Sequence, residues 1–256
     1  DFRPGYGYAG IADSQASVAA PENDGVYRID LETGEETLIL SLSRVARYLE
    51  GAQAASQKLL VNHLTCNPDG TRFVMLVRNM PGAGRASSDG RWQTATLTAG
   101  ADGQNLHTLL PFGMASHYHW RNPGELLIWA EAGPKQTQGL WLLQDRSGNA
   151  ERLDDGFFRA DGHNSYSPDG RFVLYDSYPD AQAYRHLYLY DLQERRGQTL
   201  GVFASVPNAR LPQIDIRCDL HPRWCRDGKS ITFDSVHEGH RHVYRMALGL
   251  EEGPDR

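Results

Sequence analysis

The chain has 256 residues, of which 40% are hydrophobic and 23% are charged, and its formal net charge is −6 at pH 7. This composition is typical of a folded globular protein and excludes wholesale disorder. The acidic balance gives no electrostatic drive toward nucleic acid or anionic lipid, and no apolar run approaches the roughly 18 residues of a membrane helix, so we expect neither partner.

Three cysteines are too few for a disulfide framework, since at most one pair could close. The first residues, DFRPGYGYAG, match neither the basic nor the apolar region of a signal peptide, so we expect none in this sequence. The compartment stays open, because a signal could have been removed earlier.

The N-terminal part of the chain contains three kinds of segment. Residues 1–24 are rich in Gly, Ala and Pro and predict a loop. Residues 25–42 predict two strands around an acidic turn that contains glycine, and residues 44–58 form the one segment with helical periodicity.

A repeat follows, and each copy is aligned on a turn glycine. Each glycine lies between two β-rich runs, which predicts a β-hairpin. Three of the hairpins are followed by a third strand-like run, at 139–148, 185–197 and 241–249. The four turn segments are NHLTCNPDG (62–70), SHYHWRNPG (116–124), GHNSYSPDG (162–170) and LHPRWCRDG (220–228).

Four short strands in every ~40–50 residues are typical of a β-propeller blade. We therefore predict an all-β fold, a single propeller domain over 1–256 with four-stranded antiparallel blades. Either N-terminal blades are missing from this chain, which we favour, or the termini close a five-bladed ring. The predicted parts are a loop at 1–24, the outer half of a blade at 25–42, and blades with inner hairpins at about 60–112, 115–155, 161–203 and 217–250.

A histidine occurs seven residues before each turn glycine, at His63, His117, His163 and His221. Innermost strands line the channel of a propeller, so we expect these imidazoles to converge near one mouth of the channel. The alternative is that each histidine is a structural residue hydrogen-bonded inside its own blade. The aromatic residues at Trp120, Tyr166 and Trp224 are expected in the core between blades.

The loops on the same face are polar and cationic, which suits an anionic ligand such as a carboxylated or sulfated sugar. An ordinary solvated surface is the alternative. The side chains that indicate such a ligand are Arg78, Arg85, Arg91, Tyr178, Arg185, Arg217 and His237.

Metal binding and proton transfer are both indicated at this face. Cys218 and His221 have C-x-x-H spacing, and with His163 and Asp176 they predict a site for a divalent metal, zinc ahead of manganese or calcium. A structural cysteine beside a core histidine is the alternative. His63 and His117 then remain as proton-transfer candidates.

Several segments resemble the propeller polysaccharide lyases, namely the oligogalacturonate lyases and the propeller ulvan lyases. They are NHLTCNPDGTRF, SHYHW, DGHNSYSPDGRFVLYDSYPD and RCDLHPRWCRDGKSITFDS, and the resemblance covers roughly 25–248. It implies a seven-bladed ring, a metal near the channel, and β-elimination on uronic-acid sugars, with His or Tyr as base and acid and Arg as carboxylate neutraliser.

The resemblance is carried over residue by residue. It implies catalytic roles for His63, His117, Tyr178 and Arg185, and we add substrate binding by Arg78, Arg217 and His237. This chain has Cys218-x-x-His221-x-Arg223 where an oligogalacturonate lyase is expected to have Gln-x-x-His-x-His, which favours the ulvan-lyase side.

The predicted function is therefore a lyase acting on an anionic polysaccharide or oligosaccharide. A secreted or periplasmic location would suit a polymer, and a cytoplasmic one short oligosaccharides. The alternatives are a non-catalytic TolB-like propeller that binds protein or glycan, and the propeller half of a peptidase. We find no serine-hydrolase elbow, phosphate-binding loop or dinucleotide fingerprint.

Overall fold

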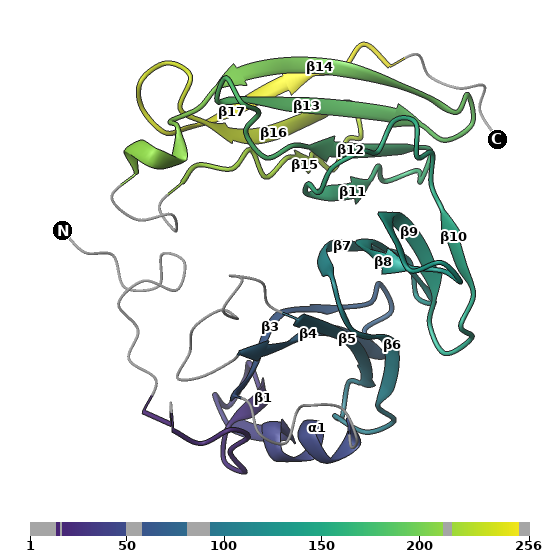
Figure 1. Cartoon of the computed structure of the whole chain (residues 1–256), viewed down its shortest axis with the longest axis vertical. Coiled ribbons are helices and arrows are strands. Elements are labelled where there is room, and N and C mark those ends of the chain that lie inside the picture. Colours follow the sequence, from purple (N-terminus) through teal and green to yellow (C-terminus); the bar gives the residue numbers. More distant parts are fainter. Residues whose placement is uncertain (1–13, 16, 50–57, 81–92, 212–216, 251–256) are drawn as a thin grey trace. The chain divides into compact units, whose positions relative to one another are not determined.

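A computed structural model of the chain describes residues 14–15, 17–49, 58–80, 93–211 and 217–250. Apart from one short helix and one 3₁₀ turn, the regular secondary structure of these residues consists of antiparallel β-sheets joined by turns and loops (Figure 1). They group into two compact units. Unit A contains residues 12–116 and 122–153, and unit B contains 117–121 and the described residues from 154 onward.

Unit A begins with the predicted hairpin of β1 (Gly25–Ile29) and β2 (Glu36–Ser41). Helix α1 (Leu42–Tyr48) follows at once, because the Ser41 hydroxyl accepts a hydrogen bond from the Arg44 N–H and caps the first turn. The helix therefore starts two residues before the predicted range of 44–58 and ends ten residues before its limit. Residues 50–57 of that range lie outside the described residues.

The first complete sheet follows the order β3-β4-β5-β6. Gly70 in the turn between β3 and β4 has a φ of 71°, which is the left-handed conformation that glycine adopts without strain. The Asp69 carboxylate closes the same turn by accepting from the Thr71 N–H. The strands are β3 (Lys58–Cys66), β4 (Arg72–Met80), β5 (Gln93–Gly100) and β6 (His107–Gly113).

The second complete sheet has the order β10-β9-β8-β7. Its strands are β7 (Ala115–Asn122), β8 (Glu125–Ala132), β9 (Thr137–Gln144) and β10 (Ala150–Arg152). The central residues of β7, 117–121, group with unit B. His117 is therefore described with that unit below.

Unit B contains the sheet β11-β12-β13-β14 and the three-stranded sheet β15-β16-β17. Leu174 and Leu187 of the first pack with Ile231 and Phe233 of the second in one apolar cluster. A 3₁₀ turn occupies Asn208–Arg210. The strands are β11 (Asn164–Tyr166), β12 (Phe172–Asp176), β13 (Tyr184–Asp191), β14 (Arg196–Ala204), β15 (Arg223–Trp224), β16 (Ser230–Ser235) and β17 (His242–Ala247).

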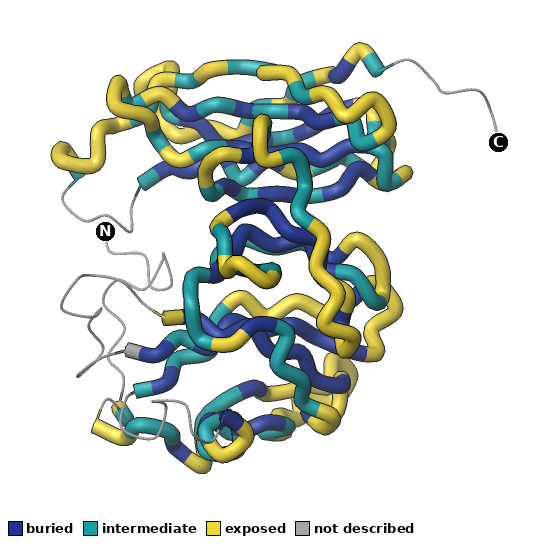
Figure 2. The backbone as a smooth tube through the Cα atoms, turned by 45° about the vertical axis from the view of Figure 1, so that its right-hand side comes forward, coloured by how far each residue is buried: buried dark blue, intermediate teal, exposed yellow. Residues whose placement is uncertain are grey.

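Burial follows the position of each strand in its sheet. All five residues of β12 are buried, whereas the outer strand β14 has none that is fully buried, and Figure 2 shows the same contrast along the chain. Trp120 and Tyr166 are buried, as predicted for the core, and Trp224 packs against the Leu174 cluster. The predicted fold class, an all-β propeller with four-stranded antiparallel blades, is confirmed.

A buried ion pair holds unit A together. The Arg72 Nε lies 2.7 Å from Oδ2 of Asp145, and the two side chains are 8% and 2% exposed. The Thr98 hydroxyl donates to the other oxygen of Asp145 at 2.7 Å and accepts from Nη2 of Arg72 at 2.7 Å. Since Asp145 follows β9 and Arg72 begins β4, this network links two sheets of the unit.

Candidate functional site

Three of the four repeat histidines lie together in unit B. The ring centroid of His163 is 4.0 Å from that of His117 and 4.0 Å from that of His221. His117 comes from β7, His163 directly precedes β11, and His221 lies two residues before β15. The repeat thus places one imidazole per copy at this point, and three successive copies meet.

Asp176 organises two of these histidines. Its carboxylate is buried at the end of β12, where it accepts from the His163 backbone N–H at 2.7 Å and lies 3.0 Å from Nδ1 of the same residue. It also accepts from the His221 backbone N–H at 3.2 Å. This contact supports His221 in a left-handed conformation with φ of 42°, which is unusual for a side chain with a Cβ.

The histidines and a carboxylate form a set of possible metal ligands. One ligand atom each from His163, Asp219 and His221 lies within 4.8 Å of the others. Because Asp176 engages Nδ1 of His163, Nε2 of that ring is left for a ligand, which is the usual arrangement of a metal-binding histidine with a carboxylate behind it. Two imidazole nitrogens and one carboxylate oxygen fit a divalent transition metal.

Two of the predicted ligands have other positions. Asp176 lies behind His163 and is occupied by the three hydrogen bonds described above. The Cys218 sulfur is absent from the group of close ligand atoms among the described residues, and burial raises the pKa of its thiol to about 11. The sequence analysis did not single out Asp219 as a possible ligand, although its spacing of two residues from His221 would place both side chains on one side of an extended segment.

Asp219 is also paired with two arginines. Nη2 of Arg185 lies 2.6 Å from Oδ1, in a close ion pair whose side chains are 3% and 6% exposed. The Nε of Arg217 lies 2.9 Å from Oδ2, and the Arg217 side chain is 28% exposed. The Arg185 side chain is therefore buried, whereas the Arg217 side chain is partly exposed at the edge of the site.

His117 and Tyr178 form the other side of the site. Nδ1 of His117 lies 3.0 Å from Oδ1 of Asp161, and its ring centroid lies 5.9 Å from that of Tyr178. Burial, with a further contribution from the nearby Asp161 charge, raises the pKa of the Tyr178 phenol to about 12. The Arg217 guanidinium lies over the same phenol ring, with Cζ 5.5 Å from the centroid.

The charges around the two neighbouring imidazoles separate their pKa values. For His163, burial opposes protonation, but the hydrogen bond and charge of Asp176, together with Asp219 and Asp161, outweigh it and raise the pKa above its usual value. For His221, burial and the neighbouring His163 lower the pKa to about 4. One imidazole of the pair therefore holds a proton more readily and the other stays neutral.

We expect NMR titration of the metal-free protein to show this difference directly. The His163 ring should titrate above the usual value of about 6.5, and His221 near 4. Between pH ~4 and pH ~6.5, His221 is protonated in the unfolded chain but stays neutral in the folded chain. The stability that neutral His221 contributes is therefore complete above pH ~6.5 and is lost as the pH falls toward 4. A single shared titration near 6.5 would contradict the assignment.

The remaining predicted residues take no part in the contacts described above. His63 is exposed at a bulge in β3, with φ of 52°, and Arg78 on β4 donates to the Thr94 hydroxyl at 2.9 Å; both belong to unit A. His237 lies in the loop after β16, where its ring contacts Phe203 and Tyr244. Their predicted roles stay predictions. Arg85 and Arg91 lie outside the described residues.

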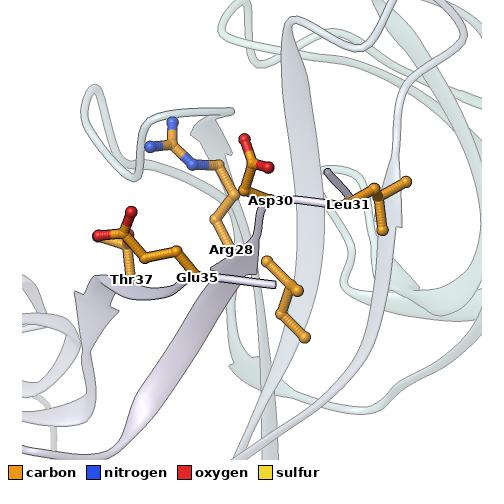
Figure 3. Close-up of a pocket in the computed structure, with 6 residues that line it drawn as sticks. Arg28, Asp30, Leu31, Glu35 and Thr37 are labelled. Carbon is orange, nitrogen blue, oxygen red and sulfur yellow. The ribbon is translucent and has the colours of Figure 1, made fainter. Parts of the chain in front are cut away.

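A hollow lies in unit A, on the β1–β2 hairpin. It has a volume of about 570 Å³, and Figure 3 shows its charged lining. The Asp30 carboxylate there is used by the turn itself, since it accepts from the N–H groups of Glu32 and Thr33. Its lining residues are Arg28, Ile29, Asp30, Leu31, Glu35 and Thr37, without a histidine or cysteine.

Among the described residues, no helix has the length and hydropathy to cross a membrane.

Comparisons with known proteins give the fold. No protein family and no curated protein matches the chain. Among solved structures, an oligogalacturonate lyase in complex with manganese is 16% identical, with 87% of this chain and 71% of that chain covered and a TM-score of 0.49. TolB from Acinetobacter baumannii is 16% identical, with 87% and 51% covered and a TM-score of 0.48.

The tricorn protease is 12% identical to the chain and has a TM-score of 0.52, over 86% of this chain. The chain spans 23% of the length of that protease. At this identity the likeness shows a shared propeller fold and no more. The chemistry of the site must be argued from its own residues.

Proposed function

We propose that the protein is a polysaccharide lyase that cleaves uronic-acid-containing polysaccharide or oligosaccharide, of ulvan or oligogalacturonate type, by β-elimination. One observation carries the proposal. His117, paired with Asp161, and the phenol of Tyr178 lie beside both Arg217 and the His163–Asp219–His221 ligand set, all within unit B. A base, an acid and positive charge are the three elements that this reaction requires.

Positive charge is needed first. Elimination removes the proton at C5 of a uronate and expels the oxygen at C4. The C5 proton becomes acidic only when the charge of the adjacent carboxylate is neutralised, because negative charge develops there in the transition state. Arg217 suits this task better than Arg185, since the Arg217 side chain is 28% exposed and that of Arg185 only 3%.

The base and the acid follow from the surroundings of each group. The Asp161 carboxylate lies 3.0 Å from Nδ1 of His117, a contact that favours the tautomer with its proton on Nδ1 and its lone pair on Nε2. We assign the removal of the C5 proton to that Nε2. Tyr178, with its pKa raised to about 12, keeps its proton at neutral pH and can donate it to the departing C4 oxygen. His163 and His221 are left to hold a metal.

We propose zinc for the His163–Asp219–His221 set, with manganese as the alternative. Two imidazoles and a carboxylate are typical zinc ligands, whereas calcium prefers oxygen ligands throughout. When bound there, a divalent metal would supply further neutralisation of the uronate carboxylate. Asp176 keeps the His163 ring oriented for this role.

The test is the formation of unsaturated uronate products, followed by their ultraviolet absorbance, from ulvan and from oligogalacturonate. Zinc-loaded protein should form product from one of them, and a chelator should slow the reaction. If neither polymer yields unsaturated product, the lyase proposal is wrong. The protein would then be better described as a non-catalytic propeller that binds protein or glycan.

A further inference from the structure

We propose that Arg217 and a divalent metal compete for the Asp219 carboxylate, so that a uronate which engages Arg217 strengthens metal binding. The identity of the uronate rests on the proposed function. The competition itself rests on the contacts of Asp219 alone. It makes Asp219 the link between the metal site and the substrate site.

The two arginines on Asp219 differ in their freedom to leave. Arg185 is 2% exposed and is also held by the Ser177 carbonyl and the Ser205 hydroxyl. Removing it would strand a buried charge, which is strongly unfavourable. Arg217 contacts both oxygens of Asp219 through Nε, at 3.1 and 2.9 Å, but its side chain is 28% exposed. Arg217 is therefore the partner that can be displaced.

A metal requires the same carboxylate. The candidate ligand atoms lie within 4.8 Å of one another, and bonds of about 2.0–2.2 Å from nitrogen and oxygen to zinc require them to draw closer together. An Asp219 oxygen that turns to the metal gives up its share of the contact with Arg217, whose Nε lies near both oxygens, and the remaining contact is weaker. Two cations beside one carboxylate also repel each other, which favours the departure of the exposed one.

The displaced arginine is then free to bind substrate. A guanidinium presents a planar pair of N–H donors that matches a carboxylate, and Arg217 is held at the site by its packing over Tyr178. Linkage makes the effect reciprocal: a carboxylate that draws Arg217 away from Asp219 must strengthen metal binding by the factor by which the metal strengthens binding of that carboxylate.

The first experiment is a calorimetric titration of the whole purified chain with zinc chloride. Arg217→Gln should bind zinc about 5- to 50-fold more tightly than the wild type, within the usual range of coupling between sites. The matched control is Arg171→Gln. Arg171 is 29% exposed and lies 2.7 Å from Asp191, at the other end of β12 from Asp176, and its loss should leave zinc affinity unchanged.

The second experiment repeats the zinc titration with saturating glucuronate. Zinc affinity should rise in the wild type and not in Arg217→Gln. The proposal is overturned if Arg217→Gln binds zinc no more tightly than the wild type, or if neither protein binds zinc. It is also overturned if glucuronate leaves the zinc affinity of the wild type unchanged. If Arg217→Gln fails to fold, Arg217→Ala takes its place.

These results are separable from the test of the proposed function. Product formation with unchanged zinc affinity in Arg217→Gln would remove the competition and leave the lyase proposal intact. Tighter zinc binding in that variant, without product from either polymer, would retain the competition and remove the lyase.

Discussion

Replacing His117 by alanine should lower kcat for product formation by about 10²- to 10⁴-fold, the usual contribution of a positioned base. The reason is the pair with Asp161, whose Oδ1 lies 3.0 Å from Nδ1 of His117 and favours the tautomer in which Nε2 is the basic nitrogen. KM should change less than kcat, because the imidazole acts mainly in the transition state. Steady-state kinetics on the polymer that yields product measures both.

The matched control is His186→Ala. His186 also pairs with a carboxylate, since its Nε2 lies 3.0 Å from Oδ2 of Asp180, and it belongs to the same unit. It lies on β13 and takes no part in the contacts of the three-histidine cluster described above. An equal loss of activity in both variants, or full activity in His117→Ala, would remove His117 from the mechanism.

Replacing Arg72 by methionine should lower the free energy of unfolding by about 3–5 kcal/mol, because the change leaves the buried Asp145 carboxylate without its buried counter-charge. Asp145 is 8% exposed overall and its side chain 2%. The Thr98 hydroxyl alone would remain as its buried donor. Urea unfolding, monitored by circular dichroism, measures the loss.

Arg146 provides the control on the same carboxylate. Its Nε lies 3.7 Å from Oδ2 of Asp145, but its side chain is 66% exposed. An exposed pair of this kind contributes about 0–1 kcal/mol, so Arg146→Gln should be nearly neutral. If Arg72→Met costs no more than Arg146→Gln, the buried network is not a major source of stability.

Much of the fold could be predicted from the sequence because its signals are local. A turn glycine such as Gly70 requires a left-handed φ, and Asp69 closes the turn with a side-chain hydrogen bond, so both residues mark the hairpin without help from distant contacts. The position of each histidine in its repeat then follows from counting. The convergence of His117, His163 and His221 could therefore be predicted from the spacing.

The carboxylates of the site were harder to predict because their roles depend on residues from other repeats. Asp161 is recognised as a site residue only through its contact with His117, which lies 44 residues earlier in the chain. The role of Asp219 depends on its contacts with Arg185 and His163, which come from other repeats. The ion pair with Asp219 also explains why the Arg185 charge can be buried. No local pattern distinguishes these residues from the aspartates that close turns, such as Asp227.

The three-histidine cluster contains one histidine from each of three successive repeats. Asp176 accepts hydrogen bonds from the backbone N–H groups of two of these histidines, His163 and His221. A nascent polypeptide that has not yet extended past residue 221 can form hairpins but not the complete cluster. In a refolding experiment, the environment of the imidazoles should therefore mature after the bulk of the strands. Zinc uptake would then report when consecutive sheets dock. Far-ultraviolet circular dichroism, which follows secondary structure, detects this step only weakly.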